Sequence, residues 1–283
     1  MVKGRGQLVV IDGIDSVGKQ TQKEMMRDYL KNTRGLVENE EFAVVDFPRY
    51  NEFSSEFVRA YLSGKLTSDP NDINPYLASS FYSIDRALSF KNEAWGEVYR
   101  NGGLVIADRY TCSNVIYQGS KLMEIRDFVG DPVKNKDMKA LHEFANWLFY
   151  YELHTLNLPK PDAIVYLTLD KEANQKLLDK RAETEGKDIH EANNEFLNRC
   201  RYTLGLYEEI MTNRLAINTS SLGLLLKGCN NIFLDITDPI TNEIMDKKTI
   251  HEIIKKEVFS FNPYITLPRI PEVKSSIYNK KDK

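Results

Sequence analysis

The sequence predicts a three-layer α/β/α domain, in which helices cover both faces of a five-stranded parallel sheet. Short apolar runs of the kind found in buried parallel strands recur along the chain. Helical patterns separate these runs, and alternation of strand and helix is typical of βαβ units. In such sheets ligands bind at the carboxyl ends of the strands, so we look for functional residues there.

The predicted strands are, in chain order, Leu8–Asp12, Phe42–Asp46, Leu104–Ala107, Ala163–Leu167 and Ile232–Leu234. The predicted helices are Lys19–Thr33, Ser55–Ser63, Asn74–Arg100, Lys139–Leu156, Lys171–Arg181, Ala192–Thr212 and Lys248–Val258. Gly130–Met138 is charged and contains proline, which predicts a surface loop. With no repeat and no Gly-, Ser- or Pro-rich linker, we expect one domain over 1–262 and a C-terminal tail over 263–283.

The first strand runs directly into a glycine-bounded loop that ends in Gly18-Lys19, and a helical pattern follows. Strand, GxxxxGK loop and helix together are the P-loop arrangement, so the predicted domain has a P-loop NTPase fold. Backbone N–H groups and the positive end of the helix would face the phosphates, and Lys19 would reach the β- and γ-phosphates. The predicted nucleotide-binding residues are Gly13, Ile14, Asp15, Ser16, Val17, Gly18, Lys19, Gln20 and Thr21.

One position of the loop departs from the usual pattern. Gln20 stands where a Ser or Thr would supply a hydroxyl to Mg²⁺, and Thr21 follows one residue later. Asp108 closes an apolar strand, which is the position of the carboxylate that holds Mg²⁺ in this class of site. The candidate metal ligands are therefore Asp15, Thr21 and Asp108.

Composition excludes several other kinds of protein. The chain is 42% hydrophobic and 28% charged, as in globular domains, and no 18-residue apolar span predicts a membrane helix. Because Met1–Gly6 leads straight into the first strand, we expect no signal peptide and a cytoplasmic protein. Cys112, Cys200 and Cys229 are far apart and form no CxxC pair, and the four histidines are scattered, so neither a disulfide framework nor a zinc site is predicted. A net charge of −3 disfavours a nucleic-acid partner.

Arginines follow two of the predicted strands. Arg49 comes after the second strand, and Arg109 comes directly after Asp108 at the end of the third. A guanidinium can bind a phosphate in bidentate fashion, and both arginines lie at the ligand-binding edge of the predicted sheet. We therefore expect them to bind phosphate.

Tyr82 and Arg86 lie one turn apart on a predicted helix. The tyrosine could stack on a flat base while the arginine contacts the edge of that base or a phosphate. On this pair alone, ordinary helix packing is the favoured interpretation.

Taken together, these segments resemble the thymidylate kinases, which are P-loop enzymes that transfer a phosphate from ATP to dTMP. The likeness rests on the loop Asp12–Lys19, on Phe47-Pro48-Arg49-Tyr50, on Asp85-Arg86, on Asp108-Arg109-Tyr110 with Ser113-Asn114 and Tyr117-Gln118, and on Leu158-Pro159-Lys160-Pro161-Asp162. These segments appear in family order between about Leu8 and Tyr207.

The resemblance implies a role for each matching residue. Phe47, Arg49 and Tyr50 would line the monophosphate side, and Arg49 and Arg109 would bind the acceptor phosphate. Tyr82 would stack on the base, with Phe81 as the alternative, and Arg86 and Asn114 would read the thymine edge. Tyr117 and Gln118 would border the sugar and base. Asp15 would contact the 3′-hydroxyl or the metal shell.

Two departures concern the catalytic cation. Some family members carry an arginine in the P-loop after the aspartate, where this chain has Ser16-Val17. A lid, expected over about 180–191, commonly closes with Asp-Arg-x-Glu, but here it reads Asp188-Ile189-His190-Glu191. Lys180, Arg181 and Lys187 are the cations available, and Arg181 is the first choice. The predicted catalytic residues are Lys19, Asp15, Arg109 and Arg181.

The predicted function is phosphoryl transfer from ATP, with Mg²⁺, to dTMP. The alternatives are a monophosphate kinase of other base or sugar specificity and a non-catalytic nucleotide-binding relative. The expected partners are small nucleotides, with no nucleic acid and no membrane. The resemblance also implies a homodimer packed through Ser55–Ser63 and Asn74–Arg100.

Overall fold

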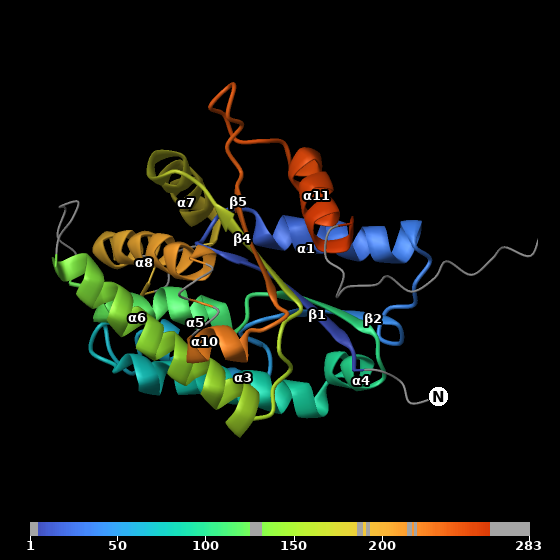
Figure 1. The fold of residues 1–283 in the computed structure, drawn as a ribbon, viewed down its shortest axis with the longest axis horizontal. Coiled ribbons are helices and arrows are strands. Elements are labelled where there is room, and N and C mark those ends of the chain that lie inside the picture. The colour runs from blue at the N-terminus through green and yellow to red at the C-terminus, as the bar shows by residue number, and fades with distance from the viewer. Residues whose placement is uncertain are drawn as a thin grey trace, which may run out of the picture.

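A five-stranded parallel sheet forms the centre of the molecule, in the order β2-β3-β1-β4-β5, and confirms the predicted fold class (Figure 1). The computed structural model describes residues 5–124, 132–185, 189–190, 193–213, 217 and 220–260. The strands are β1 (Gln7–Gly13), β2 (Phe42–Asp46), β3 (Leu104–Asp108), β4 (Ala163–Thr168) and β5 (Asn230–Asp235). Each lies within two residues of a predicted strand at either end.

Helices cover the sheet on both sides. The α-helices are α1 (Lys19–Asp28), α2 (Glu56–Leu62), α3 (Pro75–Asn92), α4 (Ala94–Arg100), α5 (Thr111–Tyr117), α6 (Pro132–Tyr150), α7 (Lys171–Glu185), α8 (Asn194–Thr212), α10 (Ser221–Leu225) and α11 (Lys247–Lys255). Helices α1 and α11 lie on one side, whereas α3, α5, α6, α8 and α10 lie on the other (Figure 1). Single turns of other helix types occur at Tyr29–Thr33, Phe53–Ser55, Gly119–Leu122, Tyr151–Thr155 and Lys256–Ser260.

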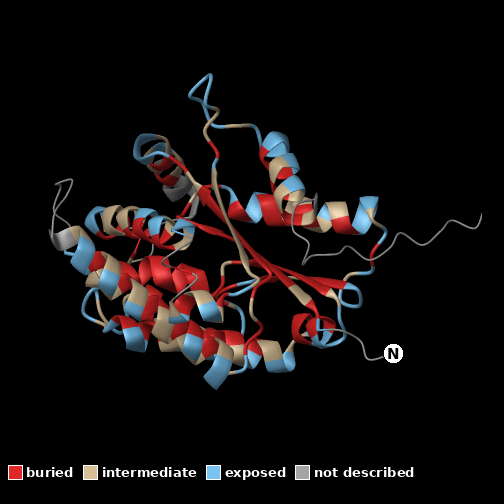
Figure 2. Ribbon diagram, viewed as in Figure 1, coloured by how far each residue is buried: buried red, intermediate tan, exposed pale blue. Residues whose placement is uncertain are grey.

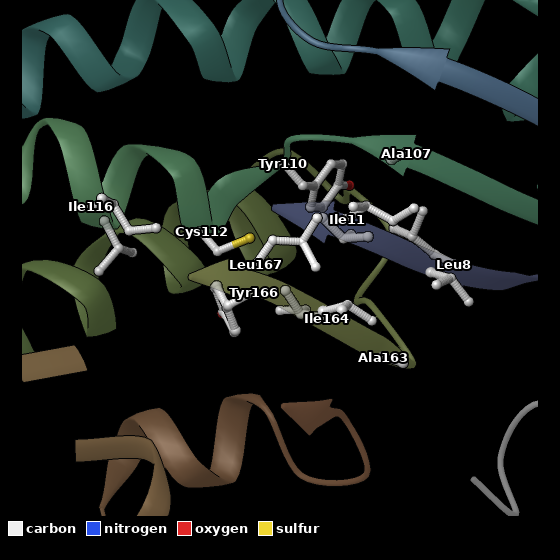
Figure 3. Close-up of a cluster of buried hydrophobic side chains, with 14 of the residues drawn as sticks. Leu8, Ile11, Ala107, Tyr110, Cys112, Ile116, Ala163, Ile164, Tyr166 and Leu167 are labelled. Atoms are coloured by element: carbon white, nitrogen blue, oxygen red, sulfur yellow. The ribbon is translucent and has the colours of Figure 1, made fainter. Parts of the chain in front are cut away.

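The core lies on both faces of the central strands, which Figure 2 shows in red. Leu8 and Ile11 of β1 are fully buried, as are Ile164 and Leu167 of β4, and they meet Ile116 of α5 in one cluster (Figure 3). Burial on both faces explains why β1 and β4 appear in the sequence as continuous apolar runs rather than alternating ones.

The predicted helix Asn74–Arg100 is wrong in one respect, because it is two helices. Glu93 between them is extended (φ −107°, ψ 162°). The turn there allows Trp95 to pack at the start of α4 against Phe47 and Phe90, with ring centroids 5.7 and 4.9 Å apart. The indole N–H of Trp95 donates to Ser89 Oγ at 2.6 Å. Burial of this tryptophan therefore overrides a helical pattern that is continuous in the sequence.

The predicted loop Gly130–Met138 is also wrong where it is described, because α6 begins at Pro132. Proline has the φ that a first helical turn needs and lacks only an N–H that would be unpaired there, so it starts this helix rather than breaking it. Helix α5 was not predicted. All seven of its residues are buried, so it shows no polar face and no amphipathic period.

Among the helices that the structure describes, none is both long enough and apolar enough to span a bilayer. The predicted tail, 263–283, lies outside the described residues.

Candidate active site

The loop between β1 and α1 turns sharply at three points. Gly13 has φ 132°, and a Cβ at this position would lie 2.2 Å from the carbonyl oxygen of Leu167 on β4, so only glycine fits. Ser16 and Gly18 also have positive φ, 62° and 86°. Because Gly18 is the N-cap of α1 and has no side chain, the first N–H groups of this helix are available to an anion.

Lys19 lies at the bottom of this loop. Its ammonium is almost fully buried and donates to the carbonyl oxygen of Ile14 at 2.5 Å. Burial, followed by repulsion from Arg109, lowers its pKa to about 8, although Asp15, Asp108 and Asp12 act in the opposite direction. A desolvated cation beside open helix N–H groups forms a site for an anion.

A cavity opens beside the loop. Of the residues predicted to bind the acceptor, nine line it: Asp15, Phe47, Tyr50, Tyr82, Arg86, Arg109, Asn114, Tyr117 and Gln118. The predicted donor and acceptor residues therefore meet at one place, with Asp15 belonging to both groups.

Asp15 binds two of the residues that line the cavity. Arg109 forms an ion pair with its carboxylate, and the Tyr117 hydroxyl donates to it at 2.7 Å. The Arg109 guanidinium lies 5.3 Å from the centroid of the Tyr117 ring. Burial opposes the charge of Arg109, but Asp15 more than offsets it, so the pKa of the guanidinium lies well above its usual value. Arg109 is therefore held as a fixed cation at the junction of loop and cavity.

Arg86 is bound by the carboxylate of Glu152, a partner that the sequence did not indicate. Its Nε donates to Glu152 at 3.0 Å and Nη2 donates to the same carboxylate, while Ser83 and Thr111 donate their hydroxyls to Glu152 as well. Both charged side chains are almost completely buried. In the described part of the chain Nη1 of Arg86 has no hydrogen-bond partner, so its two N–H groups are available to a ligand in the cavity. Glu152 lies 66 residues from Arg86, and nothing local to either residue indicates the pair.

The base side of the cavity contains polar groups without partners. Both side-chain atoms of the Gln118 amide are buried, and neither has a hydrogen bond within the described residues. Among the described residues, the Asn114 side chain makes one long bond, from Nδ2 to the carbonyl oxygen of Ser79 at 3.3 Å. Since unpaired buried amides are costly, these two side chains suit a ligand that has donors and acceptors on its edge.

Tyr82, rather than Phe81, lines the cavity. Phe81 instead stacks on Phe57 outside it, with ring centroids 5.7 Å apart and planes at 20°. The geometry thus favours Tyr82 over Phe81 as the residue that would stack on a base.

Arg49 is the one predicted acceptor residue that does not line the cavity. Its guanidinium binds Glu93 through Nε at 3.2 Å and Nη2 at 2.6 Å, and its backbone N–H donates to Asp85 at 2.8 Å. Glu93 is the extended residue between α3 and α4, so the helix break that the sequence did not indicate also provides this partner.

Four further residues of the cavity were not predicted to bind a ligand, namely Pro48, Leu62, Ser113 and His190. His190 comes from the sequence predicted to form the lid. Its Nε2 lies 3.0 Å from the Tyr61 hydroxyl, and its ring stacks on Tyr117 at 6.0 Å. Burial and the nearby charge of Lys121 lower its pKa to about 3, so the imidazole is neutral. Its place within the lid segment Asp188-Ile189-His190-Glu191 was the only signal in the sequence that pointed to the cavity.

The other residues of the predicted lid belong to α7 or lie outside the described part of the chain. Helix α7 continues to Glu185 and so includes the first part of the predicted lid. The side chains of Lys180 and Arg181, together with Lys187, Asp188 and Glu191, lie outside what the structure describes.

Asp108 is the residue that fits a magnesium ion best. Its Oδ1 is buried without a hydrogen-bond partner among the described residues, and burial raises the pKa of its carboxyl despite the nearby Lys19. An anionic oxygen without a donor at the end of a strand suits Mg²⁺ or a water of its shell. Asp15 is already bound by Arg109 and Tyr117, and Thr21 is exposed on the first turn of α1. No group of three or more His, Cys, Asp or Glu suited to a metal occurs within the described ranges.

Comparison with known proteins decides the family. The family model described as "Thymidylate kinase" matches residues 11–130. The thymidylate kinase of Mycobacterium tuberculosis is 30% identical over 171 residues, which are 58% of this chain and 67% of that protein. The chain belongs to the thymidylate kinase family. The predicted family resemblance is therefore confirmed.

Other thymidylate kinases are more distant. That of Dictyostelium discoideum is 23% identical over 172 residues, 61% of this chain, and the matched part spans only 62% of its own length. The solved structure of the thymidylate kinase from Candida albicans aligns with a TM-score of 0.55 at 20% identity, covering 89% of this chain and 92% of that one. This structural likeness shows that the thymidylate kinase fold is shared.

We expect Glu152→Gln to destabilise the protein by about 3–5 kcal/mol, because it leaves the charge of Arg86 buried without a counterion. Urea unfolding at pH 7 measures the change. Glu143→Gln, an exposed glutamate on the preceding helix, is the matched control and should leave the midpoint unchanged. A Glu152→Gln midpoint equal to that of the control would contradict this account of the pair.

Proposed function

We propose that the chain transfers the γ-phosphate of ATP to dTMP and so produces dTDP. One observation carries this proposal: Asp15 belongs to the phosphate-binding loop and, through Arg109 and Tyr117, to the wall of the adjoining cavity. A donor site and an acceptor site therefore share one residue. Membership of the thymidylate kinase family supports the same reaction.

The cavity suits a thymine or uracil base better than cytosine. Arg86 can only donate hydrogen bonds, and its available N–H groups need an acceptor such as O4 of thymine rather than the amino group of cytosine. Asn114 and Gln118 each offer one donor and one acceptor to the rest of the base edge. Tyr82 provides a flat ring for stacking against the face of the base.

The acceptor phosphate would lie toward Arg109, with Phe47 and Tyr50 as the apolar border of this end of the cavity. Asp15 and Tyr117 would then face the sugar, where the carboxylate can accept a hydrogen bond from the 3′-hydroxyl. Arg49 can join Arg109 on the phosphate only by leaving Glu93.

The chemical step needs positioning and neutralisation of charge more than a reactive side chain. An oxygen of the acceptor phosphate attacks the γ-phosphorus, the bond from that phosphorus to the bridging oxygen breaks, and ADP leaves. Lys19 and the amides of Gly13–Gln20 would hold the donor, and Arg109 would hold the attacking group. Mg²⁺ bound at Asp108 would neutralise the donor phosphates. We keep Arg181 as the lid cation that would stabilise the transferred group.

A panel of acceptors tests the proposal. ADP formation from ATP should be fastest with dTMP, slower with dUMP, and weak with UMP, CMP and AMP, and it should require Mg²⁺. Dominant turnover of AMP or CMP would overturn the thymidylate assignment. Binding of ATP and dTMP without ADP formation would instead identify a non-catalytic relative.

In the same assay we expect Arg109→Ala to reduce turnover of dTMP by about 10³-fold or more, as is typical of arginines that stabilise transferred phosphates. Arg100→Ala, at the exposed end of α4, is the control and should retain normal rates. Circular dichroism should show that both variants are folded. Near-normal turnover by Arg109→Ala would remove its proposed role.

Lys19 should make nucleotide binding depend on pH. Its pKa is about 8 in the free protein, and the phosphates of ATP raise it on binding. Affinity is therefore highest below pH 8 and falls as the pH rises through the pKa of the free protein. At pH 8 binding should take up about half a proton per site, because the free ammonium is half titrated.

Calorimetry at pH 8 in two buffers of different ionisation enthalpy measures this uptake. Lys19→Arg is the control, because a guanidinium stays charged and cannot take up a proton. Equal uptake by the wild type and by this variant would show that Lys19 is not the titrating group.

We also propose a homodimer that packs through an apolar stripe on α2 and α3. The stripe consists of Phe57, Leu77, Phe81, Ile84 and Leu88, of which all except Phe81 are exposed, by 39–60%. The four α3 positions follow intervals of three and four, so they share one face of that helix. An exposed apolar face of this kind is typical of a surface that binds another protein. A second copy would cover it with the same stripe.

Ile84→Glu should convert the dimer to a monomer, because it buries a charge at the centre of the stripe. Sedimentation velocity at micromolar concentration measures the change. Ile240→Glu, on an exposed isoleucine far from α3 in the sequence, is the control and should stay dimeric. A wild type that sediments as a monomer would contradict the proposal.

A further inference from the structure

Asn174 on α7 connects the phosphate-binding loop with α8. Its side chain is 1% exposed. Nδ2 donates to the backbone carbonyl oxygen of Asp15 at 2.7 Å, and Oδ1 accepts from Nε and Nη2 of Arg201 at 3.2 and 2.7 Å. These three hydrogen bonds join residues that are 159 and 27 positions from Asn174 in the chain.

The chemistry of the two ends determines which way the amide points. A guanidinium has only donors, so the oxygen of Asn174 must face Arg201 and its NH₂ group must face Asp15. Arg201 is fixed in turn, because its Nη1 donates to Asn198 Oδ1 at 3.1 Å. Within the described part of the chain Arg201 has amide partners and no carboxylate, and burial lowers its pKa from the usual value. The hydrogen bonds between Asn174 and Arg201 therefore fix the orientation of the Asn174 amide, and they do not depend on an attraction between opposite charges.

The carbonyl that Asn174 holds lies at the turning point of the loop. It belongs to the peptide between Asp15 and Ser16, and Ser16 has a left-handed backbone with φ 62°. That conformation is unfavourable for a residue with a side chain and needs support from its surroundings. Since the Asp15 carboxylate binds Arg109 and Tyr117, a shift of this peptide would move the group that faces the acceptor cavity.

We propose that Asn174, oriented by Arg201, is a positioning residue that sets the Asp15 carboxylate in the acceptor site. The inference rests on the proposed function, because it takes the cavity as the site of the acceptor monophosphate. It also gives α7 and α8 a defined role, which is to hold the loop at Asp15 from outside the site. Neither Asn174 nor Arg201 lines the cavity, so their effect on the acceptor is indirect.

The substitution Asn174→Asp separates positioning from stability. A carboxylate keeps both acceptor contacts with Arg201 and adds an ion pair, but it replaces the donor to Asp15 with a second oxygen. We expect the melting temperature to stay at or above the wild-type value. The KM for dTMP should rise about tenfold, which corresponds to the loss of one buried hydrogen bond with some repulsion. The KM for ATP should rise clearly less than the KM for dTMP, because Asn174 holds the loop only at Asp15, at the end that faces the acceptor.

Asn198→Asp is the matched control, because it puts the same charge beside the same arginine without touching the loop. Its KM for dTMP should stay within twofold of the wild type. If Asn174→Asp does not fold, Asn174→Ala replaces it, since alanine removes the donor without repulsion and should raise the KM for dTMP about fivefold.

An Asn174 variant that folds and keeps the wild-type KM for dTMP would overturn the proposal. So would an equal rise for dTMP and ATP, which would indicate general damage to the loop. Failure of the proposed function is seen separately, as a wild type that does not phosphorylate dTMP. In that case the same variants are compared on the monophosphate that the wild type does accept, by turnover or by calorimetric binding.

Discussion

The site depends on Asp15, because this residue lies between two cations that would otherwise repel each other. Lys19 is buried and Arg109 is partly buried, and the charge of Arg109 is one of the causes that lower the pKa of Lys19. The Asp15 carboxylate binds Arg109 and favours the charged form of Lys19. A donor phosphate and an acceptor phosphate can then each find a cation, on either side of one fixed anion. Bringing two polyanions together requires this arrangement of charges before any substrate binds.

At the other end of the cavity, Glu152 compensates the charge of a buried arginine, Arg86. Arg86 would be costly to bury alone, and the carboxylate compensates its charge while Ser83 and Thr111 complete the hydrogen bonds of Glu152. The guanidinium is thereby fixed in orientation, and the two N–H groups of its Nη1 are left for a ligand. Both ends of the acceptor cavity thus use a buried carboxylate to aim an arginine, which restricts how a nucleotide can lie between them.

Local patterns predicted the sheet, the loop and the place of Arg109 at the cavity, because strand-end positions in a parallel sheet converge whatever the rest of the chain does. The resemblance to the thymidylate kinases supplied most of the other residues that were predicted to bind the acceptor and that line the cavity. The partners of those residues could not be predicted. Glu152 and Asn174 act on Arg86 and Asp15 across 66 and 159 residues, and each lies in an unremarkable helical sequence. The break at Glu93 depends on where Trp95 is buried, which is a property of tertiary packing. The sequence thus indicated which side chains line the cavity, but not which partners hold those side chains in place.

Arg49 is likewise bound by a carboxylate, that of Glu93. Its pair with Glu93 is about one quarter exposed on each side, so water weakens the attraction between the two charges. A phosphate offers a guanidinium the same bidentate geometry as a carboxylate and carries more charge. An acceptor phosphate held at Arg109 would therefore compete successfully with Glu93 for Arg49. Glu93 keeps the arginine near the cavity and neutralised when no phosphate is bound, and since the pair is weak, its separation costs the substrate little binding energy.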